Sequence, residues 1–232
     1  MLRLITDFDG PIMDVSERYY QVYLFCLEQC QDPDRPAKPL PKPEFWRLKR
    51  ACVPERKIGI ASGLTEDQAA EFANLRRKTV HSLPYLKYDQ LAPGAVEALE
   101  KVIAAKVDLV VMTMRRVKEL DLAFGTHNLS RFFPIDRLYC LSDDYVKTGD
   151  VNDKPLLMER ALRELPPTDE VWMVGDTEAD MVAAKNHGVK AIAVLSGIRD
   201  RNQLECYKPD AIVEDLSEAV DLVLSQSSQP VS

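Results

Sequence analysis

The 232-residue sequence has no long apolar run. Clean apolar runs such as 109–112 and 191–195 span only four or five residues, whereas a bilayer-spanning helix needs roughly 18–20. The first ten residues include two aspartates, where a secretory signal peptide would need an apolar stretch. We therefore expect a soluble cytoplasmic protein that has no membrane partner.

The sequence also lacks an excess of positive charge. It contains 30 Lys and Arg against 37 Asp and Glu, a formal net charge of −7. This balance disfavours proteins that bind nucleic acid through a broadly basic surface, so we expect no nucleic-acid partner. The charge is uneven, because residues 15–90 alone hold 13 Lys and Arg against 10 Asp and Glu.

Cysteines are few and do not form a recognisable framework. There are five, an odd number, without a CxxC pair. Cys26 and Cys30 are four residues apart, as on one helix face, but no third or fourth zinc ligand lies near them in the sequence. We predict reduced thiols rather than disulfides or a structural zinc site.

Strands and helices alternate along most of the chain. An apolar strand is predicted at 2–8, and four more are predicted at 107–113, 137–141, 170–176 and 189–197, with a short one at 211–213. Helical patterns separate the later strands, one beginning near Arg115 and another with Asn152 as its N-cap. This alternation predicts an α/β fold with a Rossmann-like, doubly wound parallel sheet.

A helical block interrupts the alternation after the first strand. Helical spacing covers 15–30, five prolines make 31–43 a rigid loop, and Thr65 is a plausible N-cap for a helix over 65–83. We therefore predict that 1–14 and 92–224 form the core and that 15–91 form an inserted α-helical cap. Residues 225–232 are predicted to be a flexible tail.

Carboxylates follow two of the predicted strands. Asp7 and Asp9 end the first strand, and Asp176 and Asp180 follow the strand at 170–176. If these strands are neighbours, the carboxylates converge at the sheet edge where α/β proteins bind ligands. Such a cluster needs a cation, and oxygen ligands suit Mg²⁺. The alternative is that these residues are only helix caps and turn residues.

Four segments resemble the ordered motifs of the haloacid dehalogenase superfamily. They are DFDGPIMD, the strand that we expect to end at Thr113, Lys154 followed by Pro155 in the first turn of a helix, and GDTEADMVAAKNHG. The helical block resembles the cap of the phosphoglycolate-phosphatase-like branch. This resemblance implies a Mg²⁺-dependent phosphatase that hydrolyses a small phosphomonoester through an aspartyl phosphate, with a phosphorylated metabolite as its partner and a monomeric or homodimeric state.

The resemblance also implies a role for each motif residue. Asp7 would be the nucleophile and Asp9 the general acid and base, which favours phosphoryl transfer over dehalogenation. The metal ligands would be the Asp7 carboxylate, the Asp9 main-chain carbonyl and Asp176, while Asp180 would orient Lys154 or a metal-bound water. Thr113 and Lys154 would hold phosphate oxygens.

Two alternatives to hydrolysis remain open. A phosphomutase of the β-phosphoglucomutase type would use the same four motifs, so the core residues do not separate it from a phosphatase. A catalytically silent binding protein on the same fold is the second alternative, because fold does not determine function.

Specificity is expected to lie in the helical block. Arg50 and a loop over 55–63 that contains Arg56 and Lys57 combine positive charge with glycine, a composition suited to closing over an anion. Arg76, Arg77 and Lys78 are predicted to form a solvated face, and Arg115 to begin a helix in solvent.

Overall fold

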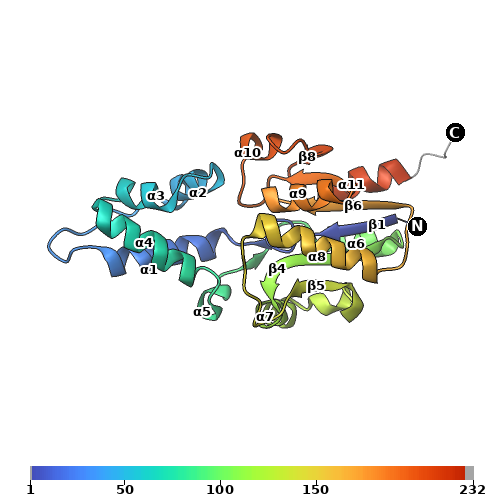
Figure 1. Cartoon of the computed structure of the whole chain (residues 1–232), viewed down its shortest axis with the longest axis horizontal. Helices are drawn as coiled ribbons and strands as arrows, with labels where there is room; N and C mark the ends of the chain where they lie inside the picture. Colours follow the sequence, from blue (N-terminus) through green and yellow to red (C-terminus); the bar gives the residue numbers. More distant parts are fainter. Residues whose placement is uncertain (1, 228–232) are drawn as a thin grey trace. The chain divides into compact units, whose positions relative to one another are not determined.

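The computed structural model describes residues 2–227 and divides into two compact units. Unit 1 contains the described parts of 1–14, 91–197 and 201–232, and unit 2 contains Val15–Gln90 with Ile198–Asp200 (Figure 1). The last helix, α11 (Leu216–Ser227), continues into the segment predicted to be a tail. The rest of that segment, 228–232, lies outside the described residues.

Unit 1 is built on a six-stranded parallel sheet, as the alternation predicted, so the α/β Rossmann-like fold class is confirmed. Its strand order is β5-β4-β1-β6-β7-β8. The strands are β1 (Leu2–Thr6), β4 (Asp108–Arg116), β5 (Leu138–Leu141), β6 (Glu170–Gly175), β7 (Lys190–Val194) and β8 (Ala211–Val213).

The order of the strands reverses at β1. The chain runs from β1 to β4 and β5 on one side and then crosses to β6, β7 and β8 on the other. β1 pairs with both neighbours in register, Thr6 standing opposite Val111 of β4 and Val174 of β6. Ligands of open α/β sheets bind at the carboxyl ends of strands at such a reversal, so the end of β1 is the expected site.

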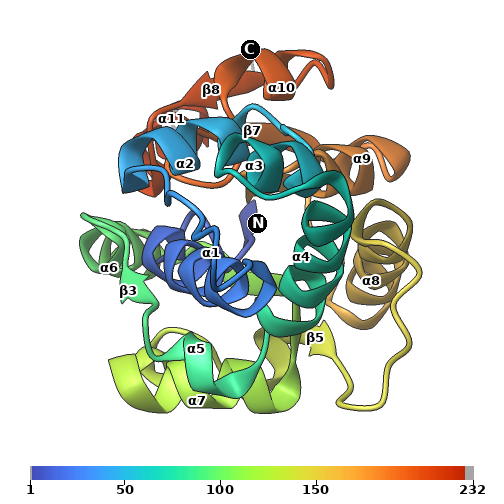
Figure 2. The same ribbon diagram turned by 90° about the vertical axis from the view of Figure 1, so that its left-hand side faces the viewer.

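Helices cover both faces of the sheet, α8 (Asp150–Glu164) and α9 (Glu178–Asn186) on one and α6 (Ala95–Ala104) and α11 on the other (Figure 2). Side chains alternate along each strand, and Ile5 and Met173 pack in the core cluster that includes Met181. α7 (Val117–His127) and the short α10 (Arg201–Glu205) complete the unit, with single 3₁₀ turns at Leu129–Arg131 and Ile135–Arg137.

Two predicted boundaries in unit 1 are wrong, and both affect motif residues. β4 continues to Arg116, so Thr113 lies inside the strand rather than at its end. α8 begins at Asp150 after Gly149, so Asn152 is not the N-cap and Lys154 lies beyond the first turn. The reason is that Gly149 has a φ of 142°, a conformation that favours glycine and starts the helix earlier.

Unit 2 is a bundle of short helices: α1 (Ser16–Cys30), α2 (Lys42–Arg50), α3 (Glu55–Ala61), α4 (Glu66–Thr79) and α5 (Leu83–Leu86). Thr65 caps α4 as predicted, and it forms a capping box with Gln68. The stretch predicted as a loop is largely α3, because Pro54 precedes its first turn and the flexible Gly63 falls after its end.

Aromatic side chains fill the centre of unit 2. Tyr23 stacks on Phe45 with ring centroids 4.5 Å apart and meets Phe72 edge-on at 6.1 Å.

Two further short strands, β2 (Met13–Asp14) and β3 (Gln90–Leu91), pair with each other. All five cysteines are free thiols, as predicted. Within 2–227, no helix has the length and apolar character needed to span a membrane.

Candidate active site

Asp7 lies at the carboxyl end of β1, held between β1 and β6. Its backbone N–H donates to the Val174 carbonyl at 2.8 Å, and its carboxylate Oδ1 accepts from the Phe8 N–H at 2.7 Å. The residue is 7% exposed. One carboxylate oxygen is therefore fixed by the backbone, and the other, Oδ2, is directed to a side chain from a different element.

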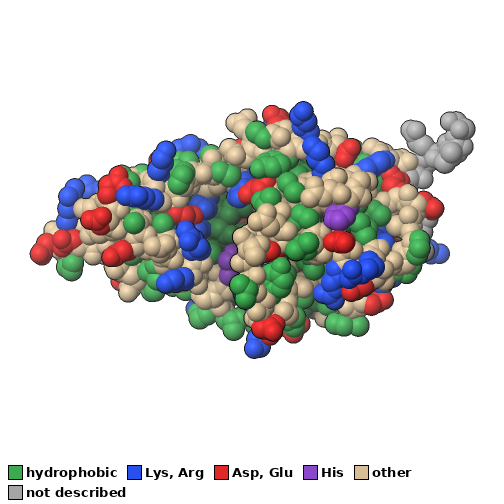
Figure 3. All heavy atoms as spheres, in the orientation of Figure 1, with side chains coloured by type: hydrophobic (Ala, Val, Ile, Leu, Met, Phe, Trp, Pro, Cys, Tyr) green, Lys and Arg blue, Asp and Glu red, His purple; other side chains and the backbone are tan. Residues whose placement is uncertain are grey.

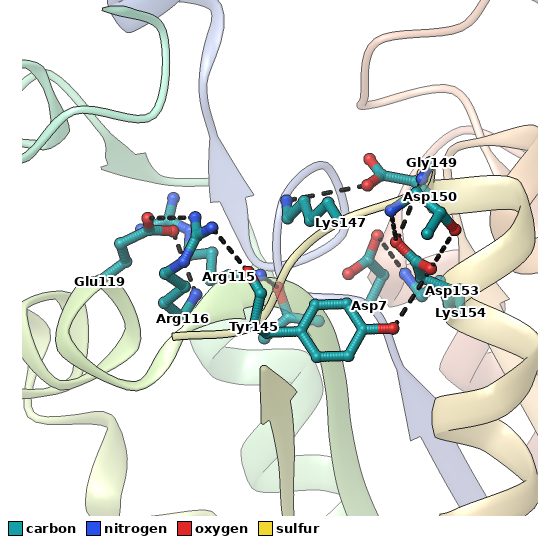
Figure 4. Close-up of polar contacts among 12 residues, drawn as sticks. Asp7, Arg115, Arg116, Glu119, Tyr145, Lys147, Gly149, Asp150, Asp153 and Lys154 are labelled. Atoms are coloured by element: carbon teal, nitrogen blue, oxygen red, sulfur yellow. Dashed lines mark hydrogen bonds and ion pairs between the residues drawn. The ribbon is translucent and has the colours of Figure 1, made fainter. Parts of the chain in front are cut away.

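That side chain is Lys154 of α8. Its Nζ lies 2.8 Å from Asp7 Oδ2 (Figure 4). The same Nζ also forms an ion pair with Asp180. Lys154 is 1% exposed. Burial lowers the pKa of Lys154, but the carboxylates of Asp180 and Asp7 outweigh burial and raise it above its ordinary value. These two acids therefore favour the charged form of Lys154.

The site nevertheless holds more negative than positive charge. Asp7, Asp176 and Asp180 are all buried, and one carboxylate oxygen from each lies within 4.8 Å of the others. Burial raises the pKa of Asp7, and the charges of Asp180 and Asp176 raise it further, while Lys154 opposes them. One lysine does not balance three carboxylates. Their oxygen ligands fit a hard divalent cation, which would supply the missing charge.

Glycine backbones form the walls against which these carboxylates pack. A Cβ at Gly10 or Gly197 would lie closer than 3.0 Å to the Asp176 side chain, and one at Gly175 equally close to Asp180. Gly10 also has a φ of 93°, which side chains rarely tolerate. The space around Asp176 thus exists only because two neighbouring residues have no side chain.

Asp180 also anchors the start of α9. Its Oδ2 accepts from the Thr177 N–H at 3.0 Å and from the Thr177 hydroxyl at 2.7 Å, forming a capping box. Asp180 is fully buried. Because its other oxygen faces Lys154, this single carboxylate joins the first turn of α9 to α8.

Asp153 holds the loop that leads into α8, a role that sequence analysis missed. It accepts hydrogen bonds from the Thr148 N–H at 2.8 Å, the Thr148 hydroxyl at 2.7 Å and the Gly149 N–H at 3.1 Å, and from the Tyr145 hydroxyl at 3.2 Å (Figure 4). Burial opposes ionisation, but these donors lower the pKa of Asp153. Asp153 precedes Lys154 and follows Thr148-Gly149 in the sequence, and this position could have indicated that it holds the loop.

Asp9 forms an ion pair with Arg115, a residue that was predicted to lie in solvent. Arg115 is 3% exposed, and its Nε donates to Asp9 Oδ1 at 2.8 Å, with Nη2 2.6 Å from the same oxygen. The guanidinium also lies over the Phe8 ring at 4.9 Å. The prediction for Arg115 is wrong because β4 extends past Thr113 and keeps Arg115 in the sheet.

The remaining predicted site residues make other contacts, each within its own unit. Thr113 is 2% exposed, and its hydroxyl accepts from the Arg115 N–H at 3.2 Å. In unit 2, Arg50 donates to the Arg199 carbonyl from Nε at 3.3 Å and Nη2 at 3.2 Å. Arg56 pairs with Glu66 at 2.7 Å, and Lys57 is exposed on α3.

Comparison with known proteins gives consistent matches. A HAD-hydrolase-like family model matches residues 153–219. The pyrophosphatase PpaX of Bacillus mycoides is 29% identical over 51% of this chain and 52% of its own length, so that match spans about half of the relative. The phosphoglycolate phosphatase of Synechococcus elongatus is 24% identical over 97% of this chain and 100% of its own length.

The fold has solved counterparts. The structure of a haloacid dehalogenase-like family hydrolase from Streptococcus pneumoniae superposes with a TM-score of 0.68 at 20% identity. The superposition covers 96% of this chain and 98% of the other, so the two share the whole fold.

Gly197 offers a test of how rigidly the carboxylates are packed. In Gly197→Ala the new Cβ must displace Asp176, which we expect to cost about 1–3 kcal/mol of stability as an overpacked core does. The matched control is Gly125→Ala in α7, where a Cβ meets nothing within 4 Å and should be neutral or stabilising. Thermal denaturation of both variants checks this, and equal midpoints would show that Asp176 moves freely.

Proposed function

We propose, from its place among the haloacid dehalogenase-like hydrolases, that this chain is a Mg²⁺-dependent phosphatase acting on a small phosphomonoester. The family itself, expected from the four motifs, is confirmed by the family model over residues 153–219, and a solved haloacid dehalogenase-like hydrolase shares the fold. One observation supports the proposal most strongly: Asp7 is a buried carboxylate paired with Lys154 at the end of β1, within a three-acid cluster. Relatives named as a phosphoglycolate phosphatase and a pyrophosphatase support a phosphorylated substrate.

In the first half of the proposed reaction, an oxygen of Asp7 attacks the phosphorus atom. The Asp7 O–P bond forms as the bond from phosphorus to the leaving oxygen breaks, which produces an aspartyl phosphate and an alcohol. Asp9 gives its proton to the leaving oxygen. A carboxylate is a suitable nucleophile because it needs no base to activate it once ionised.

In the second half, water cleaves the aspartyl phosphate. Asp9, now a carboxylate, takes a proton from the water as its oxygen bonds to phosphorus, and the bond to Asp7 breaks. The products are inorganic phosphate and the original Asp7 carboxylate, with the proton on Asp9. Atoms and charges balance, so the chain requires no redox cofactor for this reaction.

Positive charge is what the reaction needs from the surrounding residues. Lys154 and the Thr113 hydroxyl would hold oxygens of the phosphoryl group, and Asp180 would keep Lys154 in place. Asp7, Asp176 and the Asp9 carbonyl would hold Mg²⁺. When bound, Mg²⁺ offsets the repulsion between the substrate and the carboxylates.

A first experiment tests the reaction class. The purified protein should release inorganic phosphate from p-nitrophenyl phosphate and from some members of a panel of phosphorylated metabolites, with Mg²⁺ present and not with EDTA. Isomerisation of a sugar phosphate without phosphate release would instead indicate a phosphomutase. No turnover of any compound under either condition would favour a silent binding protein.

A second prediction concerns the nucleophile. Asp7→Asn should reduce phosphate release by about 10⁴-fold or more, because an amide oxygen does not form a stable phosphoryl linkage. The matched control is Asp67→Asn, which changes an exposed carboxylate in the first turn of α4 and should keep full activity. Circular dichroism should show both variants folded, and retained turnover in Asp7→Asn would refute the assignment.

A third prediction concerns Arg115, which we propose positions Asp9 for both proton transfers. Arg115→Met should lower kcat about 10- to 100-fold while KM changes little, because Asp9 loses the group that orients it. Arg115→Lys should recover part of the loss, and Lys118→Met, which removes an exposed cation from α7, should have no effect. An unchanged kcat in Arg115→Met would show that Asp9 is oriented without Arg115.

A further inference from the structure

Unit 2 contains a cavity of about 500 Å³ whose charged lining residues are mostly basic. It is bounded by residues of α1, α2, α3 and α4 and by the segment 198–199, all within the same unit. The charged lining residues are Lys49, Arg56, Arg76, Arg77 and Arg199, with Glu55 as the acid among them. Figure 3 shows several Lys and Arg side chains, in blue, on the visible face of this unit.

Arg76 is the most deeply buried of these cations. It is 5% exposed, its Nη1 lies 2.6 Å from Glu55 Oε1, and its guanidinium lies over the Tyr19 ring at 4.9 Å. Its Nε and Nη2 are buried but make no hydrogen bond to any residue that the structure describes. A buried guanidinium with unmet donors is costly, so these two groups need a partner.

Lys49 adds a second buried cation to the same acid. Its side chain is 12% exposed and forms an ion pair with Glu55. Burial and the neighbouring Arg76 together lower the pKa of Lys49 to about 8, although Glu55 opposes them. Because one carboxylate serves two buried cations, this corner of the cavity has an excess of positive charge.

We propose that this cavity binds a small anion through Arg76 and Lys49, with a phosphate or a carboxylate as the recognised group. Nε and Nη2 form one edge of the planar guanidinium, and their two N–H bonds run side by side. This fork matches two oxygens of a carboxylate or phosphate. Glu55 occupies the opposite end of the guanidinium and Tyr19 covers its face, so this edge is the part left for a ligand.

The anion has two possible sources. It is either an acidic group on the substrate remote from the reacting phosphate, or a separate small anion. Only the first source depends on the proposed phosphatase function. Binding itself is a property of unit 2 that can be measured without any turnover.

The direct test observes Arg76 during a titration with inorganic phosphate. In ¹⁵N-labelled full-length protein, the Arg76 Nε–Hε signal is the one that disappears in Arg76→Lys. We expect this signal to shift saturably with phosphate and again with malonate. In Lys49→Met the apparent Kd should rise about tenfold or more, as the loss of one charged hydrogen-bond donor predicts.

The matched control is Lys78→Met, which removes an exposed cation from the same helix but does not line the cavity. It should leave the titration unchanged. An Arg76 signal that does not move at phosphate concentrations well above the millimolar range would overturn the proposal. So would a titration in which Lys49→Met and Lys78→Met behave alike.

Kinetics distinguish the two sources once binding is established. If the anion belongs to the substrate, Arg76→Met should raise KM about tenfold or more for a phosphomonoester that carries a carboxylate, and leave p-nitrophenyl phosphate unaffected. If the anion is separate, Arg76→Met should leave both KM values unchanged while phosphate binding is lost. The absence of any turnover would refute the proposed function alone, because the titration still reports on the cavity.

Discussion

The ammonium group of Lys154, buried between the carboxylates of Asp7 and Asp180, is the contact on which the arrangement of the site depends. It joins three elements, because Asp7 directly follows β1, Lys154 belongs to α8 and Asp180 lies in the first turn of α9. Removal of one member of such a buried network typically costs about 3–5 kcal/mol, since the others remain charged and unpaired. The positions of α8 and α9 over the sheet therefore depend on the ion pairs of Lys154 at the sheet edge.

The two units carry opposite imbalances of buried charge. In unit 1, three buried carboxylates lie together and Lys154 pairs with two of them, and in unit 2 a lysine and an arginine share one glutamate. Each imbalance is unfavourable for the protein alone and is relieved by a ligand of the missing sign. Proteins tolerate such local destabilisation where binding or catalysis needs it, and other packing compensates. A divalent cation fits the first cluster, and an anion fits the second.

Patterns local in the chain predicted the fold class, the free cysteines and the Thr65 cap, because each depends on residues near one another in the sequence. Features set by distant partners were missed. Arg76 was predicted to lie on a solvated face with Arg77 and Lys78, which is wrong because it is buried. No residue near it in the sequence indicates that Glu55 and Tyr19 enclose it. Arg115 stands directly before the helix pattern, so its ion pair with Asp9, 106 positions away, leaves no local signal.

The motif residues illustrate the same distinction. Asp7 and Asp176 could be named from the sequence because they end predicted strands, and Lys154 and Asp180 because their segments resemble family motifs. How the four pair depends on the register of β1 with β6 and on where α8 begins. The start of α8 was misplaced because the Gly149 conformation and the Asp153 hydrogen bonds, rather than Asn152, set it. Local pattern identified the participants, and tertiary contacts determined their geometry.

The irregularity of β4 explains how Asp9 acquired a buried partner. The pairing of β4 with β5 shifts register between Met112 and Arg116, the stretch that contains Thr113 and Arg115. Such irregularities redirect side chains, and they are frequent beside active sites. Here the Arg115 N–H bonds to the Thr113 hydroxyl while the Arg115 guanidinium reaches Asp9. One local distortion of a single strand thus links the residue proposed to hold phosphate with the residue proposed to transfer protons.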